Sequence, residues 1–408
     1  GNVKIEKKSE MKVAFIEDSV EMGGVQYSTY FLAERLIKEK TADVRIFLPD
    51  EGPFSILCQE NNIPYCIYNG ISYISTSFSL INDKLRIPNP IAWAYNIFAI
   101  LLNSIRIKKK LKKHVPQLAV TKGLLTHFSA GQACKRLNIQ VIWHLQDLIS
   151  HRYYGLLIFI YNQLANKIPD HIICDGQIIK NSLKGPVCER SNVVLNGIKT
   201  DDLERCLKSR NEVRKELEIP AIAYVIGNLA RITPWKGQEF LLRAFIEYAG
   251  QNKNAYLMLA GSPLFDNDRY YRHLKQLVSK NDLWDRVIMP GYRTDLKDIY
   301  SAMDIFLYPP LEKDTSPLAL VSAISSGLPV AISNIESLHE ITDLCPDIDT
   351  FDPRSKDEII FIMKKYENIN IRISNGIQNE KSGKAHFDIS SHAMKMIQIF
   401  NEQISNNK

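Results

Sequence analysis

Short apolar runs alternate with amphipathic stretches along most of the chain. In the first half the apolar runs are MKVAFIED, ADVRIFLP, IPYCIY, QLAVTKG, IQVIWHL and HIICDG. Runs of this length are typical of buried strands, and the segments between them carry apolar residues at helical spacing. The alternation predicts an α/β fold, in which helices cover a parallel sheet.

The same alternation starts again in the second half of the chain. Its apolar runs are AYVIGNLARI, AYLMLAGS, RVIMPGY, DIFLYPP and LPVAISN, and an Asn-Gly turn in VVLNGI separates the two series. A chain of 408 residues is also long enough for two domains. We therefore expect two doubly wound, Rossmann-like domains at 11–195 and 196–385, facing a central cleft. A helix over 386–408 is expected to pack back toward the first domain.

Composition limits the class of protein. Hydrophobic residues at 45% and charged residues at 24% are ordinary for a globular protein. The seven cysteines are scattered without a C-x-x-C pair, which argues against zinc and against a disulfide framework and favours a reducing cytoplasm. We find no run of 18 apolar residues and no signal-peptide pattern, so we expect neither secretion nor a membrane span. Residues 1–10 are set aside as a remnant or a tail.

Charge is concentrated in one place. The net charge of +6 is modest, but RIKKKLKKH directly follows the apolar segment 91–105. Two interpretations of 91–114 stay open: contact with an anionic membrane surface, or a core helix with a solvated basic end. Nucleic acid is not expected as a partner, because aromatic residues do not interleave the basic run. We expect a cytoplasmic protein, peripheral at the inner face of the membrane if the first interpretation holds.

Gly23 and Gly24 follow the first predicted strand. In a doubly wound sheet, ligands bind beyond the carboxyl ends of the strands. Two residues without side chains there would let a phosphate or an acceptor approach the backbone amides closely. The alternative interpretation is a tight turn from strand to helix.

Arg231 and Lys236 lie in GNLARITPWKG, at one junction between a strand and a helix that begins near Gly237. Together they could neutralise a diphosphate, Arg231 through its planar fork of donors and Lys236 as a compact charge.

The segment 306–333 predicts a strand, a proline-rich loop, a helix from about Leu318 and a further strand. Thr315 or Ser316 is expected to be the N-cap, with Pro317 in the first turn, which leaves the amides of Leu318 and Ala319 for a diphosphate. Asp314 lies just ahead of this helix. Because its charge repels phosphate, we expect it to accept hydrogen bonds from sugar hydroxyls.

From 11 to about 385 the chain resembles the retaining glycosyltransferases of family four, the glycosyl transferases group 1, which have the GT-B fold. The resemblance rests on the order and spacing of several motifs. They are the strand before Gly23-Gly24, His144 in VIWHLQD, VVLNGI, NLARITPWKG, LMLAGS, MPGYRTDLKDIYSAMDIFLYPP and the helix that ends in SSGLPVAIS.

The resemblance implies a role for each matching residue. It places Arg231 and Lys236 on the donor diphosphate, and His144 at the sugar near the transferring group. The implied catalytic residues are His144, Arg231, Lys236 and Asp314. The implied donor-binding residues are Gly23, Gly24, Arg231, Lys236, Asp314, Ser316, Leu318, Ala319 and Ser322. The resemblance implies neither a cofactor nor a metal, and no Asp-x-Asp pair follows a predicted strand.

The family signature, two glutamates separated by seven residues, is altered here. Asp314 stands at the first position and Ser322 at the second. In the family the second glutamate accepts hydrogen bonds from the ribose hydroxyls. Its loss is expected to weaken donor binding by ~1.5–3 kcal/mol, or about 10- to 150-fold in affinity. Glu340 matches a glutamate that often follows the signature, or else is a carboxylate on a helix surface.

Three function classes follow. The first is a metal-independent enzyme of the hexosyltransferase type, which moves a sugar from a UDP or GDP sugar to a glycan or lipid-linked acceptor. Its setting would be the synthesis of a bacterial cell-surface polysaccharide. The second is a catalytically degenerate GT-B protein that acts as a binding or partner module, which Ser322 motivates. The third, a nucleotide-sugar epimerase, is disfavoured because its catalytic carboxylates have no counterparts here.

Overall fold

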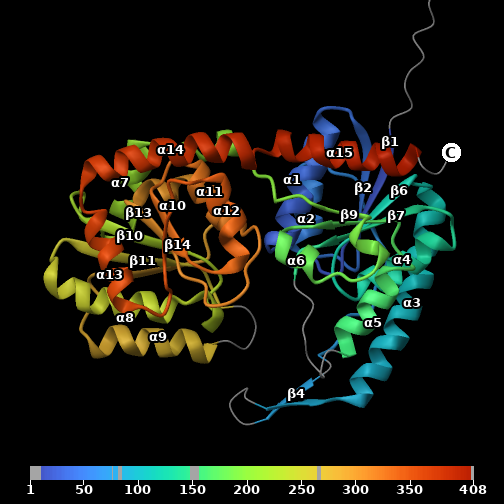
Figure 1. The fold of residues 1–408 in the computed structure, drawn as a ribbon, viewed down its shortest axis with the longest axis horizontal. Coiled ribbons are helices and arrows are strands. Elements are labelled where there is room, and N and C mark those ends of the chain that lie inside the picture. The colour runs from blue at the N-terminus through green and yellow to red at the C-terminus, as the bar shows by residue number, and fades with distance from the viewer. Residues whose placement is uncertain (1–10, 76, 81–84, 148–155, 264–267, 406–408) are drawn as a thin grey trace, which may run out of the picture. The chain divides into compact units, whose positions relative to one another are not determined.

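The computed structural model describes residues 11–75, 77–80, 85–147, 156–263 and 268–405 (Figure 1). The chain divides into two compact units, Gly1–Gly197 with His392–Lys408, and Ile198–Ser391. The first unit is therefore made of two segments, the first of which runs to Gly197, and the domain bounds 11–195 and 196–385 stay predictions. The segment 1–10 that we set aside lies outside the described residues.

The first unit is built on a seven-stranded sheet in the order β3-β2-β1-β6-β7-β8-β9, and every neighbouring pair is parallel. Its strands are β1 Met11–Ile16, β2 Ala42–Leu48, β3 Tyr65–Ile67, β6 Leu118–Thr121, β7 Gln140–Leu145, β8 His171–Cys174 and β9 Ser191–Val193. A separate antiparallel hairpin pairs β4 Ser77–Leu80 with β5 Leu85–Pro88.

Helices cover both faces of this sheet, as the alternation predicts. They are α1 Gly24–Lys38, α2 Pro53–Glu60, α3 Pro90–His114, α4 Thr126–Lys135, α5 Leu156–Ala165 and α6 Gln177–Asn181. Phe15 and Leu32 are buried in the core on one face, and Trp143 and Leu111 in the core on the other. Successive side chains of each strand therefore point to opposite faces of the sheet and pack into two separate cores.

The last helix, α15 Ile389–Ser405, returns the chain to the first unit. Ala393, Met396 and Phe400 are buried in the same core as Phe15, and the Phe400 and Phe15 rings lie 6.5 Å apart edge to face. The buried apolar face of α15 thus explains why the C-terminal residues belong to the first unit.

The second unit has a six-stranded sheet in the order β12-β11-β10-β13-β14-β15, again parallel throughout. Its strands are β10 Tyr224–Leu229, β11 Ala255–Ala260, β12 Val287–Gly291, β13 Ile305–Tyr308, β14 Val330–Ser333 and β15 Asp349–Phe351. Its helices are α7 Leu207–Glu216, α8 Gln238–Gln251, α9 Asp268–Lys280, α10 Leu296–Ala302, α11 Leu318–Ser325, α12 His339–Leu344, α13 Lys356–Lys365 and α14 Ile369–Phe387.

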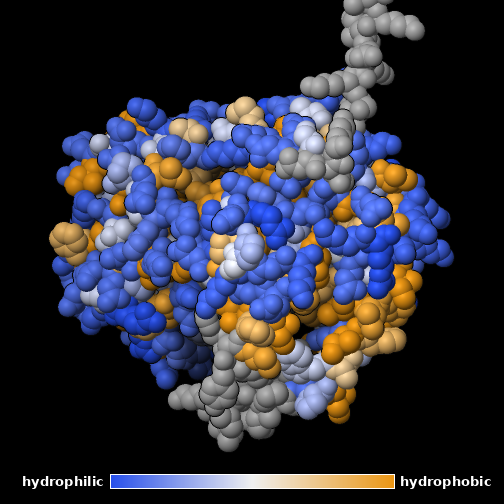
Figure 2. Space-filling model, turned by 45° about the vertical axis from the view of Figure 1, so that its right-hand side comes forward, coloured by the Kyte–Doolittle hydropathy of each residue, from blue (hydrophilic) through white to orange (hydrophobic). Residues whose placement is uncertain are grey.

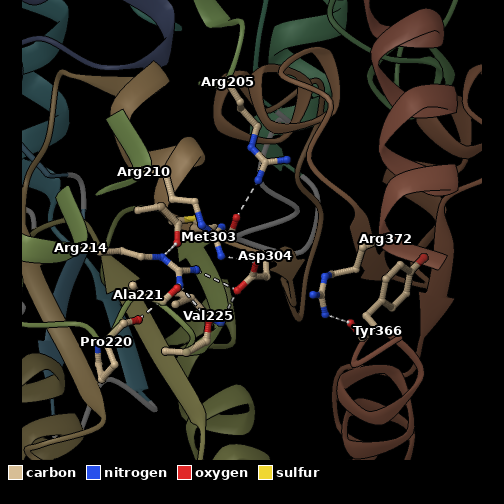
Figure 3. Close-up of polar contacts among 12 residues, drawn as sticks. Arg205, Arg210, Arg214, Pro220, Ala221, Val225, Met303, Asp304, Tyr366 and Arg372 are labelled. Carbon is tan, nitrogen blue, oxygen red and sulfur yellow. Dashed lines mark hydrogen bonds and ion pairs between the residues drawn. The ribbon is translucent and has the colours of Figure 1, made fainter. Parts of the chain in front are cut away.

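A group of arginines fastens α7 to the amino ends of two central strands (Figure 3). The carboxylate of Asp304, which precedes β13, accepts hydrogen bonds from Arg210 at 3.0 Å, from Arg214 at 2.9 Å and from the backbone N–H of Val225 in β10 at 2.7 Å. The guanidinium of Arg205 donates to three backbone carbonyls. These contacts are structural, and they lie at the opposite end of the strands from the loops where a ligand is expected.

In both sheets the strand order reverses next to the first strand of the unit. The reversal falls between β1 and β6 in the first sheet and between β10 and β13 in the second. Ligands of doubly wound sheets bind beyond the carboxyl ends of the strands at such a point. The residues that follow these four strands therefore define the candidate sites.

Candidate functional site

The loop after β10 is shaped by Gly237. The chain makes a single 3₁₀ turn over Pro234–Lys236, and Gly237 then adopts a left-handed backbone with φ of 73° before α8 begins. A Cβ atom on Gly237 would lie 1.8 Å from the carbonyl oxygen of Pro309. Only glycine lets this loop come so close to the loop after β13, and the close approach brings Lys236 to Tyr308.

Lys236, Tyr308 and Asp314 form one tight cluster at the carboxyl ends of β10 and β13. The Lys236 ammonium donates to the Tyr308 hydroxyl at 2.6 Å and to Asp314 Oδ2 at 2.5 Å, and the Tyr308 hydroxyl donates to the same oxygen at 2.5 Å. Lys236 is only 9% exposed. Burial, and then the neighbouring Asp314 carboxylate, raise the pKa of Tyr308 well above its usual value, so the phenol stays protonated.

This cluster joins two residues that the sequence analysis treated separately. Lys236 is paired with Asp314, and the backbone N–H of Asp314 is itself held by the Ser337 hydroxyl at 2.9 Å. Arg231 is exposed in the loop after β10, and it is near enough for its charge to oppose slightly the rise in the pKa of Tyr308. The arrangement therefore combines a buried, oriented ammonium with an exposed guanidinium.

The start of α11 corrects one expectation. Neither Thr315 nor Ser316 caps the helix: the N-cap is Pro317, and no side-chain hydrogen bond caps the helix there. The reason is local, because Ser316 is buried with a left-handed φ of 44°, which takes it out of the extended conformation that a capping serine needs.

Leu318 and Ala319 are the first two residues of α11. The first N–H groups of a helix have no acceptor within it, so these amides are suited to bind an anion. Ser322 follows in the same helix and is 3% exposed, and Glu340 lies in the first turn of α12.

In the first unit, Gly23 and Gly24 lie at the start of α1. Gly23 is the N-cap with an extended backbone, Gly24 is the first helical residue, and neither has a positive φ. A Cβ atom on Gly24 would meet nothing within 4 Å. The position of Gly24 therefore does not require glycine, and the interpretation that a ligand approaches the backbone here stays a prediction.

His144 is buried rather than exposed at the end of β7. It is 1% exposed, and its Nε2 lies 2.6 Å from Asp175 Oδ1. The other oxygen of Asp175 accepts from Gln146 at 3.0 Å and from Asn196 at 2.9 Å. Burial alone would raise the pKa of Asp175, but His144, Lys122 and the hydrogen bonds outweigh burial and lower the pKa.

The same buried layer continues across the sheet to β6 and β1. Lys122, which follows β6, donates to the Ser28 hydroxyl of α1 at 2.8 Å. Burial lowers the pKa of Lys122, although the carboxylates of Glu17 and Asp175 oppose this shift. Glu17, which follows β1, accepts from the Thr29 hydroxyl at 2.5 Å, and burial raises its pKa to about 7.

Sequence reasoning missed most of this layer. Glu17, Lys122 and Asp175 each follow an apolar strand in AFIED, AVTKG and IICDG. The parallel arrangement of their strands brings them to one edge of the sheet, and that arrangement was the available signal. Tyr308 in IFLYPP was missed for a different reason, because a tyrosine at the end of an apolar run is usually part of the core.

Among the residues that the structure describes, no group of three or more His, Cys, Asp or Glu side chains could hold a metal ion.

Comparison with known proteins identifies the second unit most clearly. Residues 209–344 match the family profile described as glycosyl transferases group 1. An Escherichia coli UDP-Gal:alpha-D-GlcNAc-diphosphoundecaprenol alpha-1,3-galactosyltransferase is 23% identical over 61% of this chain and 63% of its own length. The Escherichia coli O-antigen biosynthesis glycosyltransferase WclY is 26% identical over 43% of this chain and 47% of its own. The matched regions thus span less than two thirds of these relatives.

Solved structures extend the likeness to nearly the whole chain. Anabaena HepE, solved in complex with UDP and glucose, superposes with a TM-score of 0.80 at 19% identity, over 96% of this chain and 100% of that one. WaaG, a glycosyltransferase involved in lipopolysaccharide biosynthesis, superposes with a TM-score of 0.66 at 15% identity, over 95% and 99% of the two chains. These likenesses show that the two units share the fold of such enzymes.

Proposed function

We propose that this chain, which carries a glycosyl transferases group 1 region over residues 209–344 on a GT-B fold, transfers a sugar from a nucleotide-diphosphate sugar to a glycan or glycolipid acceptor. One observation carries the proposal. The buried Lys236–Asp314–Tyr308 cluster lies where the strand order of the second sheet reverses, just ahead of the first amides of α11, and Arg231 lies in the same loop as Lys236.

The chemistry follows from where charge develops. As the bond from the sugar to the diphosphate breaks, negative charge grows on the leaving phosphates. Arg231, the Lys236 ammonium and the amides of Leu318 and Ala319 would take up that charge. Asp314 holds Lys236 in place and offers its remaining acceptor capacity to sugar hydroxyls. We propose transfer of the hexosyl type, with retention at the anomeric carbon and without a metal.

The relatives support the choice of donor and acceptor classes. HepE was solved with UDP-glucose, and the galactosyltransferase of Escherichia coli is named for a UDP donor and a lipid diphosphate acceptor. We propose a UDP sugar as donor, with GDP as the other base to test. We propose synthesis of a bacterial cell-surface polysaccharide as the setting.

Donor hydrolysis tests the proposal without a known acceptor. The protein is incubated with UDP-glucose, UDP-galactose, UDP-N-acetylglucosamine and GDP-mannose, and NMR follows the anomer that is first released. We expect one donor to be consumed with retention, and kcat/KM to fall at least about 10²- to 10³-fold in Arg231→Ala. Arg243→Ala, which removes a half-exposed arginine of α8, is the matched control. Inversion would contradict the proposal, and nucleotide binding without turnover of any donor would favour the degenerate alternative.

The apolar face of α3 supports a membrane-bound location. Among the described residues one helix, Pro90–His114, is long and apolar enough to cross a membrane, and a third of its most apolar window is buried. Asn96 and Asn103 on its buried face each bond both backbone groups of one residue, Ile74 and Ile71 respectively. A helix tied to its own unit in this way is better suited to lie on a membrane than to cross it.

The opposite face of α3 is apolar and exposed, and it ends in lysines. Ile97, Phe98, Leu101 and Ile105 are 49–58% exposed, and the exposed Lys109 and Lys112 continue the same helical stripe. In α5, Leu156 and Phe159 are also more than half exposed, and Figure 2 shows apolar side chains gathered at the lower right, where this side of the first unit comes forward. We propose a cytoplasmic protein that rests on the anionic inner face of the cell membrane through this stripe.

A further inference from the structure

Tyr308 is the anchored member of the cluster at the carboxyl ends of β10 and β13. It is the last residue of β13, it is 1% exposed, and its ring stacks on that of Phe306 with the centroids 6.0 Å apart. Lys236, in contrast, ends a 3₁₀ turn, and Asp314 lies in the loop between β13 and α11. Groups on strands are held more precisely than groups on loops. Tyr308 is therefore the fixed point of the cluster.

The Tyr308 hydroxyl makes one hydrogen bond of each kind. It donates to Asp314 Oδ2 at 2.5 Å and accepts from the Lys236 ammonium at 2.6 Å. Burial and the Asp314 carboxylate hold the pKa of Tyr308 well above its usual value, so the hydroxyl keeps the hydrogen that it donates. Because that hydrogen points to Asp314, the lone pairs of the same oxygen are left for the ammonium.

The ion pair with Asp314 alone would place the Lys236 ammonium loosely. An ammonium is a compact point charge on a flexible stem, so attraction to a carboxylate fixes its distance more than its direction. The faces of the Trp235 and Tyr308 rings, with centroids 4.2 Å and 5.1 Å from Nζ, attract the charge without a preferred hydrogen-bond direction. The Tyr308 hydroxyl adds a directional partner that the strand holds in place.

We propose that Tyr308 is a positioning residue, whose hydroxyl holds the Lys236 ammonium where it meets the diphosphate of the donor. The diphosphate rests on the proposed function, whereas the coupling of Tyr308 to Lys236 does not. The alternative is a core tyrosine whose hydroxyl only satisfies its own need for a partner beside an existing ion pair. The two roles differ in what removal of the hydroxyl does to Lys236.

Two conservative variants of the full-length protein separate these roles. Tyr308→Phe removes the hydroxyl and keeps the ring. Tyr224→Phe is the matched control, because Tyr224 is also buried in the second sheet and its hydroxyl donates to the Met363 carbonyl at 3.0 Å. Each variant therefore loses one hydroxyl that is hydrogen-bonded in the native protein, and only the first loss touches Lys236.

Acetylation of lysines measures how firmly the Lys236 ammonium is held. The protein without nucleotide is treated with a trace of acetic anhydride, and mass spectrometry gives the rate at Lys236 relative to Lys365, which is paired with Asp349 in the same unit. This rate should rise at least about 10-fold in Tyr308→Phe, since a hydrogen bond to a charged group is worth that much or more. It should not change in Tyr224→Phe. Equal rates in the two variants would overturn the proposal.

Turnover tests whether the placement of Lys236 matters. With a donor that the native protein consumes, kcat/KM should fall about 10- to 100-fold in Tyr308→Phe, since a misplacement of about 1 Å in an active site can cost about 10²-fold. Tyr224→Phe should keep the native value. In a Lys236→Met background, Tyr308→Phe should cause little further loss, because the group that it places is gone. Losses that multiply in the double variant, or equal kcat/KM in the two tyrosine variants, would overturn the positioning role.

The outcomes separate this inference from the proposed function. If Tyr308→Phe speeds acetylation of Lys236 but the native protein neither binds nor consumes a nucleotide sugar, the proposed function fails while the coupling of Tyr308 to Lys236 stands. If the native protein consumes a donor and Tyr308→Phe changes neither acetylation nor kcat/KM, the proposed function stands and the role of Tyr308 is overturned.

Discussion

At the scale of single residues, the buried carboxyl group of Glu17 makes stability depend on pH. Burial raises its pKa from 4.5 to about 7. The folded protein therefore binds more protons than the unfolded chain between these values. The contribution of Glu17 to stability is fully present below pH 4.5 and is lost as the pH rises through 7.

We expect Glu17→Gln to remove this pH dependence. Between pH 5 and pH 8 the native protein should lose stability that Glu17→Gln does not lose. The difference in the free energy of unfolding, variant minus native, should therefore rise by roughly 3 kcal/mol, since one pKa unit corresponds to about 1.4 kcal/mol. Urea denaturation at both pH values measures the difference. Glu21→Gln, which changes an exposed carboxylate four residues away, should show no such trend, and parallel curves for both variants would refute the assignment.

Gly24 offers a test of whether a ligand approaches α1. Because a Cβ atom there meets nothing within 4 Å, Gly24→Ala should leave stability unchanged. If a donor or acceptor approaches the backbone, the same change should weaken its binding on the order of 10-fold, about 1.4 kcal/mol. Gly250→Ala in α8, where a Cβ atom is equally unhindered, is the control. Equal affinities for both variants would leave only the turn interpretation.

Some site residues could be predicted from sequence and others could not. Arg231, Lys236 and Asp314 stand at strand ends in a recognisable order, and the structure places Lys236 in contact with Asp314. The cap of α11 was predicted wrongly, because Ser316 is buried with a left-handed backbone, which the residue types around it do not indicate. Asp175 was missed because a single polar residue after a strand is too common to be informative.

At the scale of elements, the apolar runs correctly predicted the long central strands. The strands that were missed are short: β9 and β15 have three residues each and lie at sheet edges, and the hairpin β4–β5 stands apart from both sheets. Edge strands bury fewer side chains, so their sequence carries little periodicity. The basic end of α3 was visible in the sequence, but which of its faces is buried was not.

The exposed stripe of α3 predicts how the protein binds membranes. Lys109→Glu, Lys112→Glu and Lys113→Glu combined should weaken binding to phosphatidylglycerol-containing vesicles at least about 100-fold, since each lysine near an anionic surface contributes ~1 kcal/mol. Cosedimentation measures the binding, with pure phosphatidylcholine vesicles for comparison. A triple charge reversal of the exposed Lys208, Lys215 and Lys253 in the second unit is the matched control. Equal binding by both triple variants would reject the surface.

At the scale of the whole molecule, the chain repeats one architecture twice. Both units are parallel sheets whose strand order reverses beside the first strand, and the α/β prediction is confirmed. The first unit is discontinuous, because the chain leaves it at Gly197 and re-enters at His392. The central cleft between the domains stays a prediction, since apolar patterns specify the inside of each domain and carry no information on their relative placement.

Calorimetric titration with UDP, GDP and their sugar conjugates tests the central claim most directly. The account predicts that one nucleotide binds, that Arg231→Ala abolishes the binding and that Ser322→Glu strengthens it, because a carboxylate at that position can hold two ribose hydroxyls. Binding that survives Arg231→Ala, or the failure of every nucleotide to bind even to Ser322→Glu, would contradict a donor site in the second unit.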